Sequence, residues 1–147
     1  MKQSENFMEL KFPSRSANEA FARAAVASFA AQLDPTLDEL GDIKTAVSEA
    51  VTNCIVHAYP DCIGTITLRA RLLPGRVLDL TVRDRGVGIP DVAQASRPMF
   101  TTGGAERSGM GITIMESFMS EFRITSTPGK GTTVHMKRRI VRRGGKK

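Results

Sequence analysis

The chain has 147 residues, of which 41% are hydrophobic and 24% are charged, and its formal net charge at pH 7 is +6. No apolar run approaches the roughly 20 residues that cross a bilayer, and two cysteines are too few for a disulfide framework. The first residues also lack the apolar core of a signal peptide. These features predict a single soluble, cytoplasmic domain over residues 1–147, with no membrane partner.

Much of the positive charge lies in a basic tail over residues 137–147. Such a tail could suggest nucleic acid, but the chain has only one tyrosine and no tryptophan to stack on bases. We therefore interpret the tail as solvated charge and expect no direct nucleic-acid binding.

The first half of the chain predicts an edge strand followed by two helices. Residues 7–13 alternate weakly in polarity and end at a proline, as edge strands often do. Ser16 and Glu19 have the spacing of a capping box, and so do Thr36 and Glu39, so a helix should begin at each pair. Helical spacing predicts these core positions: Phe21, Ala25, Phe29 and Leu33, then Leu40, Ile43, Val47, Ala50, Val51, Cys54 and Ile55.

The second half changes to the two-residue period of strands. Segments 65–72 and 78–84 alternate in polarity on either side of Pro74-Gly75, which predicts a β-hairpin with one apolar face. Asp84 has the same parity as the apolar residues before it. Its carboxylate should therefore point toward the covered face, where a buried charge needs a partner.

A long segment over residues 91–108 has the length of a lid or binding loop. A third helix opened by Gly109-Met110-Gly111 follows, and then strands over 122–126 and 132–137. Grouped helices with mostly hairpin-connected strands predict an α+β fold. We expect a two-layer sandwich in which helices cover one face of a mixed, mostly antiparallel sheet.

Three short motifs could carry chemistry. Glu49 and Asn53 lie one turn apart on one helical face, Asp84-Arg85-Gly86-Val87-Gly88 lets a backbone approach a ligand, and Gly109-Met110-Gly111 offers N–H groups at a helix start. Each motif alone has an ordinary structural explanation, as a solvated face, a turn or a helix start. Gly104 and Gly109 have P-loop spacing, but the required lysine is missing. A dinucleotide fingerprint is excluded because its third glycine is missing.

Together and in this order, the motifs resemble the N box and the glycine boxes of the Bergerat-fold (GHKL) ATPases and kinases. Gly131-Thr132 resembles the glycine-threonine element that ends the pattern in this family. Thr132 shares strand parity with Val134 and Met136, so it should face inward. The resemblance is stronger to one branch, the serine kinases that act as anti-sigma factors of sporulation sigma-F. The segments that carry it are 21–23, 48–53, 100–102 and 106–111.

The resemblance implies an ATP/ADP site with Mg²⁺. Asp84 would accept a hydrogen bond from the adenine amino group, with Thr132 assisting through water, and Asn53 would bind the metal. Glu49 would be the general base that accepts the proton of a protein serine. The further nucleotide-site residues that the resemblance implies are Gly86, Gly88, Thr101, Thr102, Arg107, Ser108, Gly109, Met110 and Gly111, with Arg107 reaching the terminal phosphate.

The same resemblance implies two protein partners. A homodimer would hold and inhibit a sigma factor through the first helix, at Glu19 and Arg23, and an anti-anti-sigma protein would be the phosphorylation substrate. These two residues could equally form an ordinary i, i+4 ion pair. The alternatives are an equivalent kinase for a stress-response sigma factor, or a non-catalytic module that binds sigma under nucleotide control. We expect a structural role for His57 and simple exposure for His135.

Overall fold

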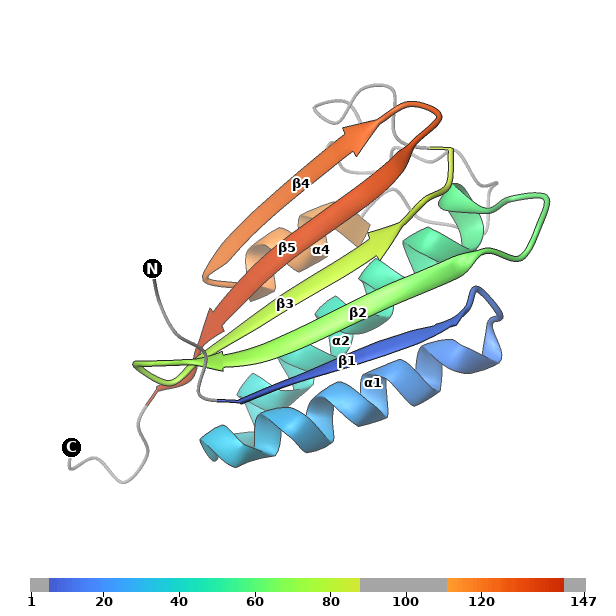
Figure 1. Cartoon of the computed structure of the whole chain (residues 1–147). Helices are drawn as coiled ribbons and strands as arrows, with labels where there is room; N and C mark the ends of the chain where they lie inside the picture. The colour runs from blue at the N-terminus through green and yellow to red at the C-terminus, as the bar shows by residue number, and fades with distance from the viewer. Residues whose placement is uncertain (1–5, 88–110, 142–147) are drawn as a thin grey trace.

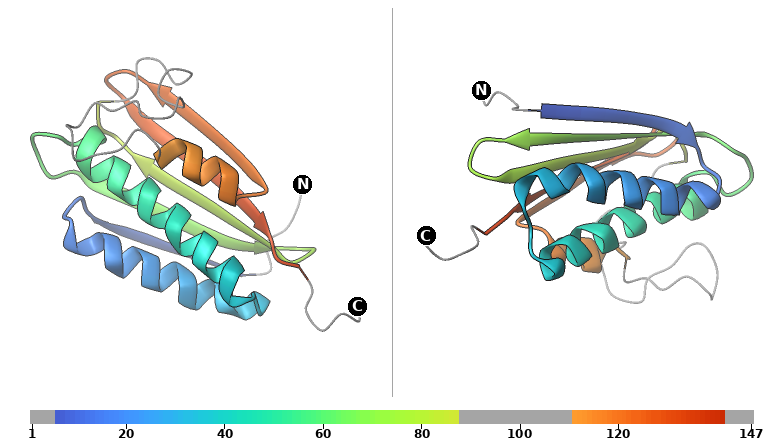
Figure 2. Two further views of the ribbon diagram at one scale, coloured as in Figure 1. Left: turned by 180° about the vertical axis from the view of Figure 1, so that it is seen from behind. Right: turned by 90° about the horizontal axis from the view of Figure 1, so that it is seen from below.

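The computed structural model describes residues 6–87 and 111–141, and only the backbone of residues 111–114. Five strands form one sheet in the order β1-β2-β3-β5-β4, and helices α1, α2 and α4 lie together on one of its faces (Figure 1; Figure 2). The strands are β1 (Asn6–Pro13), β2 (Thr65–Leu73), β3 (Val77–Asp84), β4 (Glu121–Thr127) and β5 (Gly131–Arg139), and the α-helices are α1 (Ala17–Ala30), α2 (Leu37–Asn53) and α4 (Gly111–Phe118).

The sheet confirms the α+β class and the two-layer arrangement. Strand β1 lies at one edge, as its proline predicts, and β2 and β3 form the expected hairpin. All four pairings among the described strands are antiparallel, so the mixed pairing that we expected does not occur among them. The hairpin turn uses left-handed backbone at Gly75 and Arg76, with φ of 84° and 63°.

Helix α2 begins with the predicted capping box. The backbone N–H of Thr36 donates to the Glu39 carboxylate at 2.9 Å, and the Glu39 N–H donates to the Thr36 hydroxyl at 3.0 Å. The capping box predicted at Ser16 is wrong. Ser16 is itself in helical conformation, where its hydroxyl caps no backbone N–H, and the Glu19 carboxylate turns toward α2 instead of back to Ser16.

The predicted core face of α2 is confirmed. In α1 the buried positions lie one residue after the predicted Phe21, Ala25 and Phe29, whereas Leu33 is buried as predicted. Ile43 and Val47 of α2 are fully buried, but Phe21 of α1 is 53% exposed. Helix α1 packs against α2 through small residues, which allow the two backbones to approach closely, so the larger aromatic ring is left outside. The buried residues of α1 are Ala22, Val26 and Ala30.

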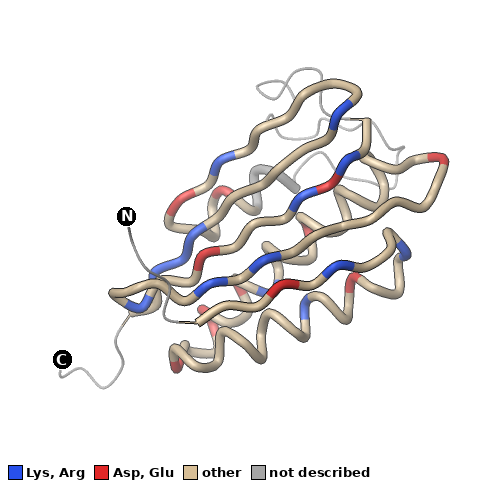
Figure 3. Tube along the Cα trace, viewed as in Figure 1, with Lys and Arg blue, Asp and Glu red and all other residues tan. Residues whose placement is uncertain are grey.

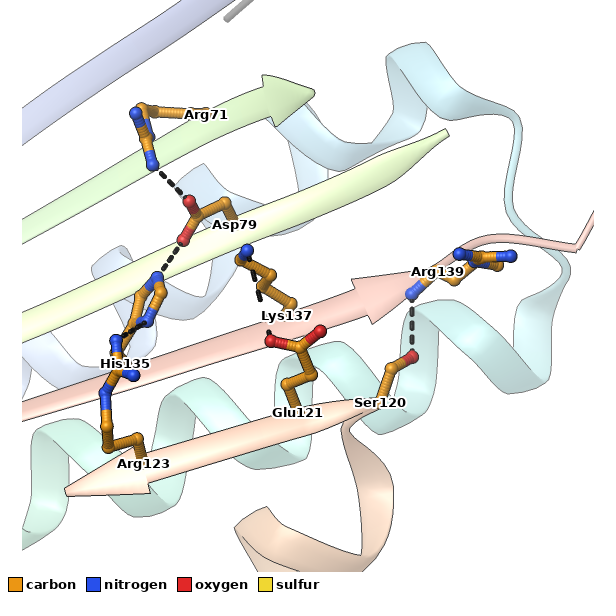
Figure 4. A network of polar contacts seen from close by, with 8 residues as sticks. All are labelled: Arg71, Asp79, Ser120, Glu121, Arg123, His135, Lys137 and Arg139. Carbon is orange, nitrogen blue, oxygen red and sulfur yellow. Dashed lines mark hydrogen bonds and ion pairs between the residues drawn. The ribbon is translucent and has the colours of Figure 1, made fainter. Parts of the chain in front are cut away.

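The open face of the sheet, opposite the helices, carries a polar network across its central strands (Figure 4). Asp79 is only 1% exposed and accepts hydrogen bonds from Arg71 and from the His135 ring, whose Nε2 lies 2.6 Å away. Nη2 of Arg123 lies 3.2 Å from Nδ1, the other ring nitrogen of His135. His135 thus faces outward as predicted but is not simply exposed, because a cross-strand carboxylate binds it.

Strand parity places more cations than acids on this face, and Figure 3 marks the basic residues of the strands in blue. The cations whose strand parity places them on the open face are Lys11, Arg69, Arg71, Arg83, Arg123, Lys137 and Arg139.

None of the helices within the described ranges has both the length and the apolar character that crossing a membrane requires.

Candidate functional site

The C-terminal end of α2 changes its helical pitch at the candidate site. Asn53 is the last residue of α2, and a π-helical turn, η2 (Cys54–Ala58), continues directly from it. The N–H of Tyr59 closes this turn on the carbonyl of Cys54 at 3.2 Å. Single π-turns are uncommon and often occur at functional sites. Glu49 and Asn53 lie one turn apart just before it, and both are half-buried.

Asp84, the last residue of β3, lies on the covered face of the sheet and is 6% exposed. Its Oδ1 accepts two backbone hydrogen bonds, from Gly86 at 2.9 Å and from Thr132 at 3.1 Å. Its Oδ2 is contacted by the Cys54 thiol at 3.5 Å. Within the described ranges, no cation lies at ion-pair distance from this carboxylate. Backbone amides and a thiol therefore satisfy a buried carboxylate here in place of a salt bridge.

The start of β5 lies directly against the end of β3. Gly131 has φ of +123°, and a Cβ on it would lie 2.2 Å from the carbonyl oxygen of Asp84. Only glycine fits this position without strain. Thr132, the next residue, is 8% exposed, and its hydroxyl shares a 2.8 Å hydrogen bond with Ser126. Thr132 faces inward, as its strand parity predicted.

The loop after β3 is bound to η2, which Figure 1 places beside the end of that strand. The N–H of Val87 donates to the Ala58 carbonyl at 3.0 Å. A Cβ on Gly86 would lie 2.1 Å from the same carbonyl oxygen, so glycine is required for this close approach. The first glycine motif is therefore held by the end of the helix that carries Glu49 and Asn53.

Tyr59 adds a second connection, which sequence reasoning did not identify. Its hydroxyl accepts a hydrogen bond from the N–H of Arg85 at 2.7 Å and donates to the carbonyl of Thr65 at 2.9 Å. Burial is the main cause that raises the pKa of Tyr59; the Arg85 N–H opposes it, and the negative charge of Asp84 adds to it. Tyr59 therefore stays neutral and joins the loop after β3 to the start of β2.

Cys54 was predicted as a core residue, and it is 4% exposed. Burial, followed by the adjacent charge of Asp84 and the hydrogen bond to it, raises the pKa of the thiol well above its ordinary value. The thiol therefore remains protonated and can donate to Asp84. Its contact with a buried carboxylate 30 residues further along the chain could not be read from helical periodicity.

The described side chains fit the adenine and metal ends of a nucleotide site. Within the described part of the chain, the half-buried Asn53 amide has no hydrogen-bond partner, so its oxygen can bind a hard cation such as Mg²⁺. The second oxygen of Asp84 has only a weak thiol donor and keeps capacity for an amino group. Within residues 6–87 and 111–141, no group of three or more His, Cys, Asp and Glu side chains could hold a metal ion.

From the predicted nucleotide site, the structure brings Asp84, Gly86 and Thr132 together through hydrogen bonds. The Cys54 contact joins Asp84 to the C-terminal part of α2, which carries Glu49 and Asn53. Gly111 begins α4, which packs beside α2. The remaining predicted residues lie outside the described ranges, namely Gly88, Thr101, Thr102, Arg107, Ser108, Gly109 and Met110.

Glu19 and Arg23 form the i, i+4 ion pair, with 3.2 Å between guanidinium and carboxylate. The pair also reaches α2, because the Ser48 hydroxyl donates to Glu19 and accepts from Arg23 at 3.3 Å. Ser48 directly precedes Glu49. The candidate partner surface on α1 is thus hydrogen-bonded to the helix that carries the candidate base.

Comparisons with known proteins agree with this geometry. The model of the family described as "Histidine kinase-like ATPase domain" matches residues 12–138. An anti-sigma F factor of Caldanaerobacter subterraneus subsp. tengcongensis is 59% identical over 93% of this chain and 96% of its own length. The anti-sigma F factor of Geobacillus kaustophilus is 54% identical over 93% of this chain and 94% of its own.

Two solved structures show the same fold at low sequence identity. The RsbU and RsbW domains of a Mycobacterium tuberculosis protein match with a TM-score of 0.67 and 21% identity, over 92% of this chain and 32% of that one. The histidine kinase domain of a blue-light activated kinase from Erythrobacter litoralis matches with a TM-score of 0.57 and 24% identity, over 83% of this chain and 60% of that one. The chain belongs to the histidine kinase-like ATPase domain (GHKL) family, in the branch of the anti-sigma F factors.

Proposed function

We propose that this protein is an anti-sigma factor and an ATP-dependent protein serine kinase. It binds and inhibits a sigma factor of the sigma-F type, and it phosphorylates a serine of the corresponding anti-anti-sigma protein. The observation that carries the proposal is the contact between the end of α2 and Asp84. Through Cys54, the C-terminal part of the helix that carries residues suited to a base and a metal ligand is joined to a buried carboxylate suited to adenine.

The chain's own residues divide the work of phosphoryl transfer. Asp84 accepts a hydrogen bond from the amino group of adenine, while the backbone N–H of Thr132 donates to the same carboxylate and holds it in place. Asn53 supplies an amide oxygen for Mg²⁺. Bound Mg²⁺ neutralises charge on the phosphates, which, together with positioning, is the main source of rate in this reaction class.

Glu49 acts as the general base. It takes the proton of the substrate serine hydroxyl as that oxygen bonds to the terminal phosphorus of ATP, and the bond to the bridging oxygen breaks to release ADP. On the phosphate side, Gly109 and Gly111 donate backbone N–H groups to phosphate oxygens, and Arg107 reaches the terminal phosphate. The other proposed nucleotide-site residues are Gly86, Gly88, Thr101, Thr102, Ser108 and Met110. A phosphate adds about −1.5 to −2 charges to the substrate at neutral pH, enough to weaken its docking to the kinase.

The sigma factor binds a homodimer of this chain through α1. The anti-sigma F naming of the relatives and the surface of α1 support this assignment. Glu19 and Arg23 present a pair of opposite charges there, and the neighbouring Phe21 is 53% exposed, which suits a protein-binding surface.

The test is transfer of labelled terminal phosphate from Mg-ATP to purified anti-anti-sigma protein. We expect wild type to label a serine and Glu49→Gln to transfer at least about 100-fold more slowly. Nucleotide binding should be unchanged in Glu49→Gln, because Gln keeps the size and polarity of the side chain. Asp38→Asn is the matched control on the exposed first turn of the same helix and should transfer normally.

Two results would contradict the kinase assignment. Wild type that binds ADP and sigma factor but transfers no phosphate would instead be a nucleotide-controlled binding module. Loss of ATP binding in Glu49→Gln would mean that Glu49 is a binding residue and not the base. Retention of a stress-response sigma factor in place of the sigma-F type would correct only the partner.

A further inference from the structure

The two oxygens of the Asp84 carboxylate have different surroundings. Oδ1 accepts two strong hydrogen bonds from backbone N–H groups, from Gly86 at 2.9 Å and from Thr132 at 3.1 Å. A carboxylate oxygen offers about two lone-pair directions, so Oδ1 has no capacity left. Any amino group that Asp84 recognises must therefore bind Oδ2.

The only described group on Oδ2 is the thiol of Cys54, with Sγ at 3.5 Å. Cys54 is 4% exposed, and it is the first residue of the π-helical turn that follows Asn53. A thiol is a weak donor, and it uses only one of the two lone-pair directions. It therefore limits rotation of the carboxylate about its Cβ–Cγ bond while leaving Oδ2 able to accept a second hydrogen bond.

We infer that Cys54 is a positioning residue for adenine recognition: its thiol orients Oδ2 of Asp84 toward the exocyclic amino group of the base. The inference rests on the proposed function, because it assumes that Asp84 reads adenine. The inference adds Cys54, which directly follows Asn53 in the chain. Two adjacent residues of one helical turn then set the metal end and the adenine end of the site. The simpler explanation is that Cys54 only fills the core, as buried cysteines often do.

The two explanations differ in which ligands they affect. A residue that orients Oδ2 matters only for ligands that donate an amino group to it, whereas a packing residue affects every nucleotide alike. Purine riboside triphosphate has the ring and phosphates of ATP but lacks the exocyclic amino group. Its affinity should therefore not depend on the orientation of Oδ2.

The experiment measures dissociation constants for ATP and purine riboside triphosphate by calorimetry, in wild type and three variants. Cys54→Ala removes the donor, Cys54→Ser keeps a donor at the same place, and Val47→Ala makes a cavity in the same helix at a fully buried apolar residue. Thermal unfolding of each protein without nucleotide reports the loss of packing separately. Cys54→Val, which fills the space without a donor, takes the place of Cys54→Ala if that variant does not fold.

We expect Cys54→Ala to raise the dissociation constant for ATP about three- to tenfold, which is the effect of losing one modest hydrogen bond. The dissociation constant for purine riboside triphosphate should stay within about twofold of the wild-type value. Cys54→Ser should bring the affinity for ATP back to within about threefold of wild type. Val47→Ala should lower the unfolding temperature without changing the ratio of the dissociation constants for ATP and purine riboside triphosphate. Equal weakening of both ligands, or no change for ATP, would overturn the inference. A wild type that binds neither ligand would overturn the proposed function, and the inference with it.

Discussion

The carboxylate of Glu39 accepts a hydrogen bond from the backbone N–H of Val141, at 2.9 Å and 102 residues further along the chain. The same side chain closes the capping box of α2, so the first turn of this helix is bound to the end of the last strand. Burial acts to raise the pKa of Glu39, but the backbone N–H groups of Thr36 and Val141 and the charge of Arg138 outweigh it. The pKa of Glu39 is therefore lowered.

This lowered pKa predicts a pH-dependent contribution to stability. A depressed carboxyl pKa stabilises the fold above the unfolded value, about 4.3, and the contribution is lost as pH falls through the folded value. Glu39→Gln should lower the free energy of unfolding by about 1–2 kcal/mol at pH 7. In urea unfolding followed from pH 7 to pH 3, the difference from wild type should shrink below about pH 4.3. A constant difference would show that the charge of Glu39 is not involved.

Tyr59→Phe should destabilise the protein by about 1–3 kcal/mol. The change removes one oxygen and leaves the N–H of Arg85 and the carbonyl of Thr65 without their partner. Urea unfolding at pH 7 measures the loss. Thr81→Val, which also removes a hydroxyl but on the open face of the sheet, should change stability by less than about 0.5 kcal/mol. Equal effects of the two substitutions would contradict the role of Tyr59.

Two glycine-to-alanine substitutions should act in opposite directions. A Cβ on Gly86 would lie 2.1 Å from the Ala58 carbonyl oxygen, so Gly86→Ala must move the loop and should cost about 1–3 kcal/mol. A Cβ on Gly41, within α2, meets nothing within 4 Å, and Gly41→Ala should stabilise by about 0.5–1 kcal/mol. Thermal unfolding of both variants checks the pair. Nucleotide affinity should fall only in Gly86→Ala.

Asp84→Asn should lower the affinity for ATP about 10- to 100-fold, because the amide can present an N–H group where the amino group of adenine needs an acceptor. Calorimetric titration with ATP measures the change, and thermal unfolding without nucleotide checks the fold. Asp61→Asn, at an exposed position, is the matched control. Unchanged ATP affinity in a folded Asp84→Asn protein would remove Asp84 from the adenine site.

Exchanging the charges of Glu19 and Arg23 separates partner binding from local pairing. The double variant Glu19→Arg, Arg23→Glu keeps an i, i+4 ion pair but reverses the order of charges along α1. We expect unfolding stability to change by less than about 1 kcal/mol, because the pair lies at the surface of α1, with Arg23 40% exposed, and both charges stay available to Ser48. Retention of sigma factor in a pull-down should fall at least about tenfold. Full retention would mean that the pair serves α1 and Ser48 alone.

The local parts of this fold could be predicted from the sequence. Strand parity placed Asp84 and Thr132 on the covered face, and the spacing of Thr36 and Glu39 gave a true capping box. Both are short-range signals, set by the geometry of one strand or one helical turn. The same spacing failed at Ser16, which lies in helical conformation, and Glu19 there contacts Arg23 and Ser48 of another helix.

The parts that could not be predicted depend on contacts between distant segments. Asp79 and His135 are polar residues at open-face positions, and only strand register shows that they meet. Cys54 looked like any apolar helix residue until the fold placed it against Asp84. The sequence Tyr59-Pro60 indicates only the end of a helix. It does not predict the hydroxyl bonds of Tyr59, because these depend on where β2 begins and β3 ends. Periodicity reports which face a residue occupies but not what lies opposite.

The π-helical turn after Asn53 makes the length of this segment as important as its composition. Such a turn contains one residue more than the α-helical turn it replaces, so it changes the rotational phase of everything that follows. Deleting one residue from 55–57 would restore regular α-helix and rotate the Ala58 carbonyl by about 100° relative to Asn53. Such a deletion would keep every chemical group that binds the loop after β3, yet direct them away from it.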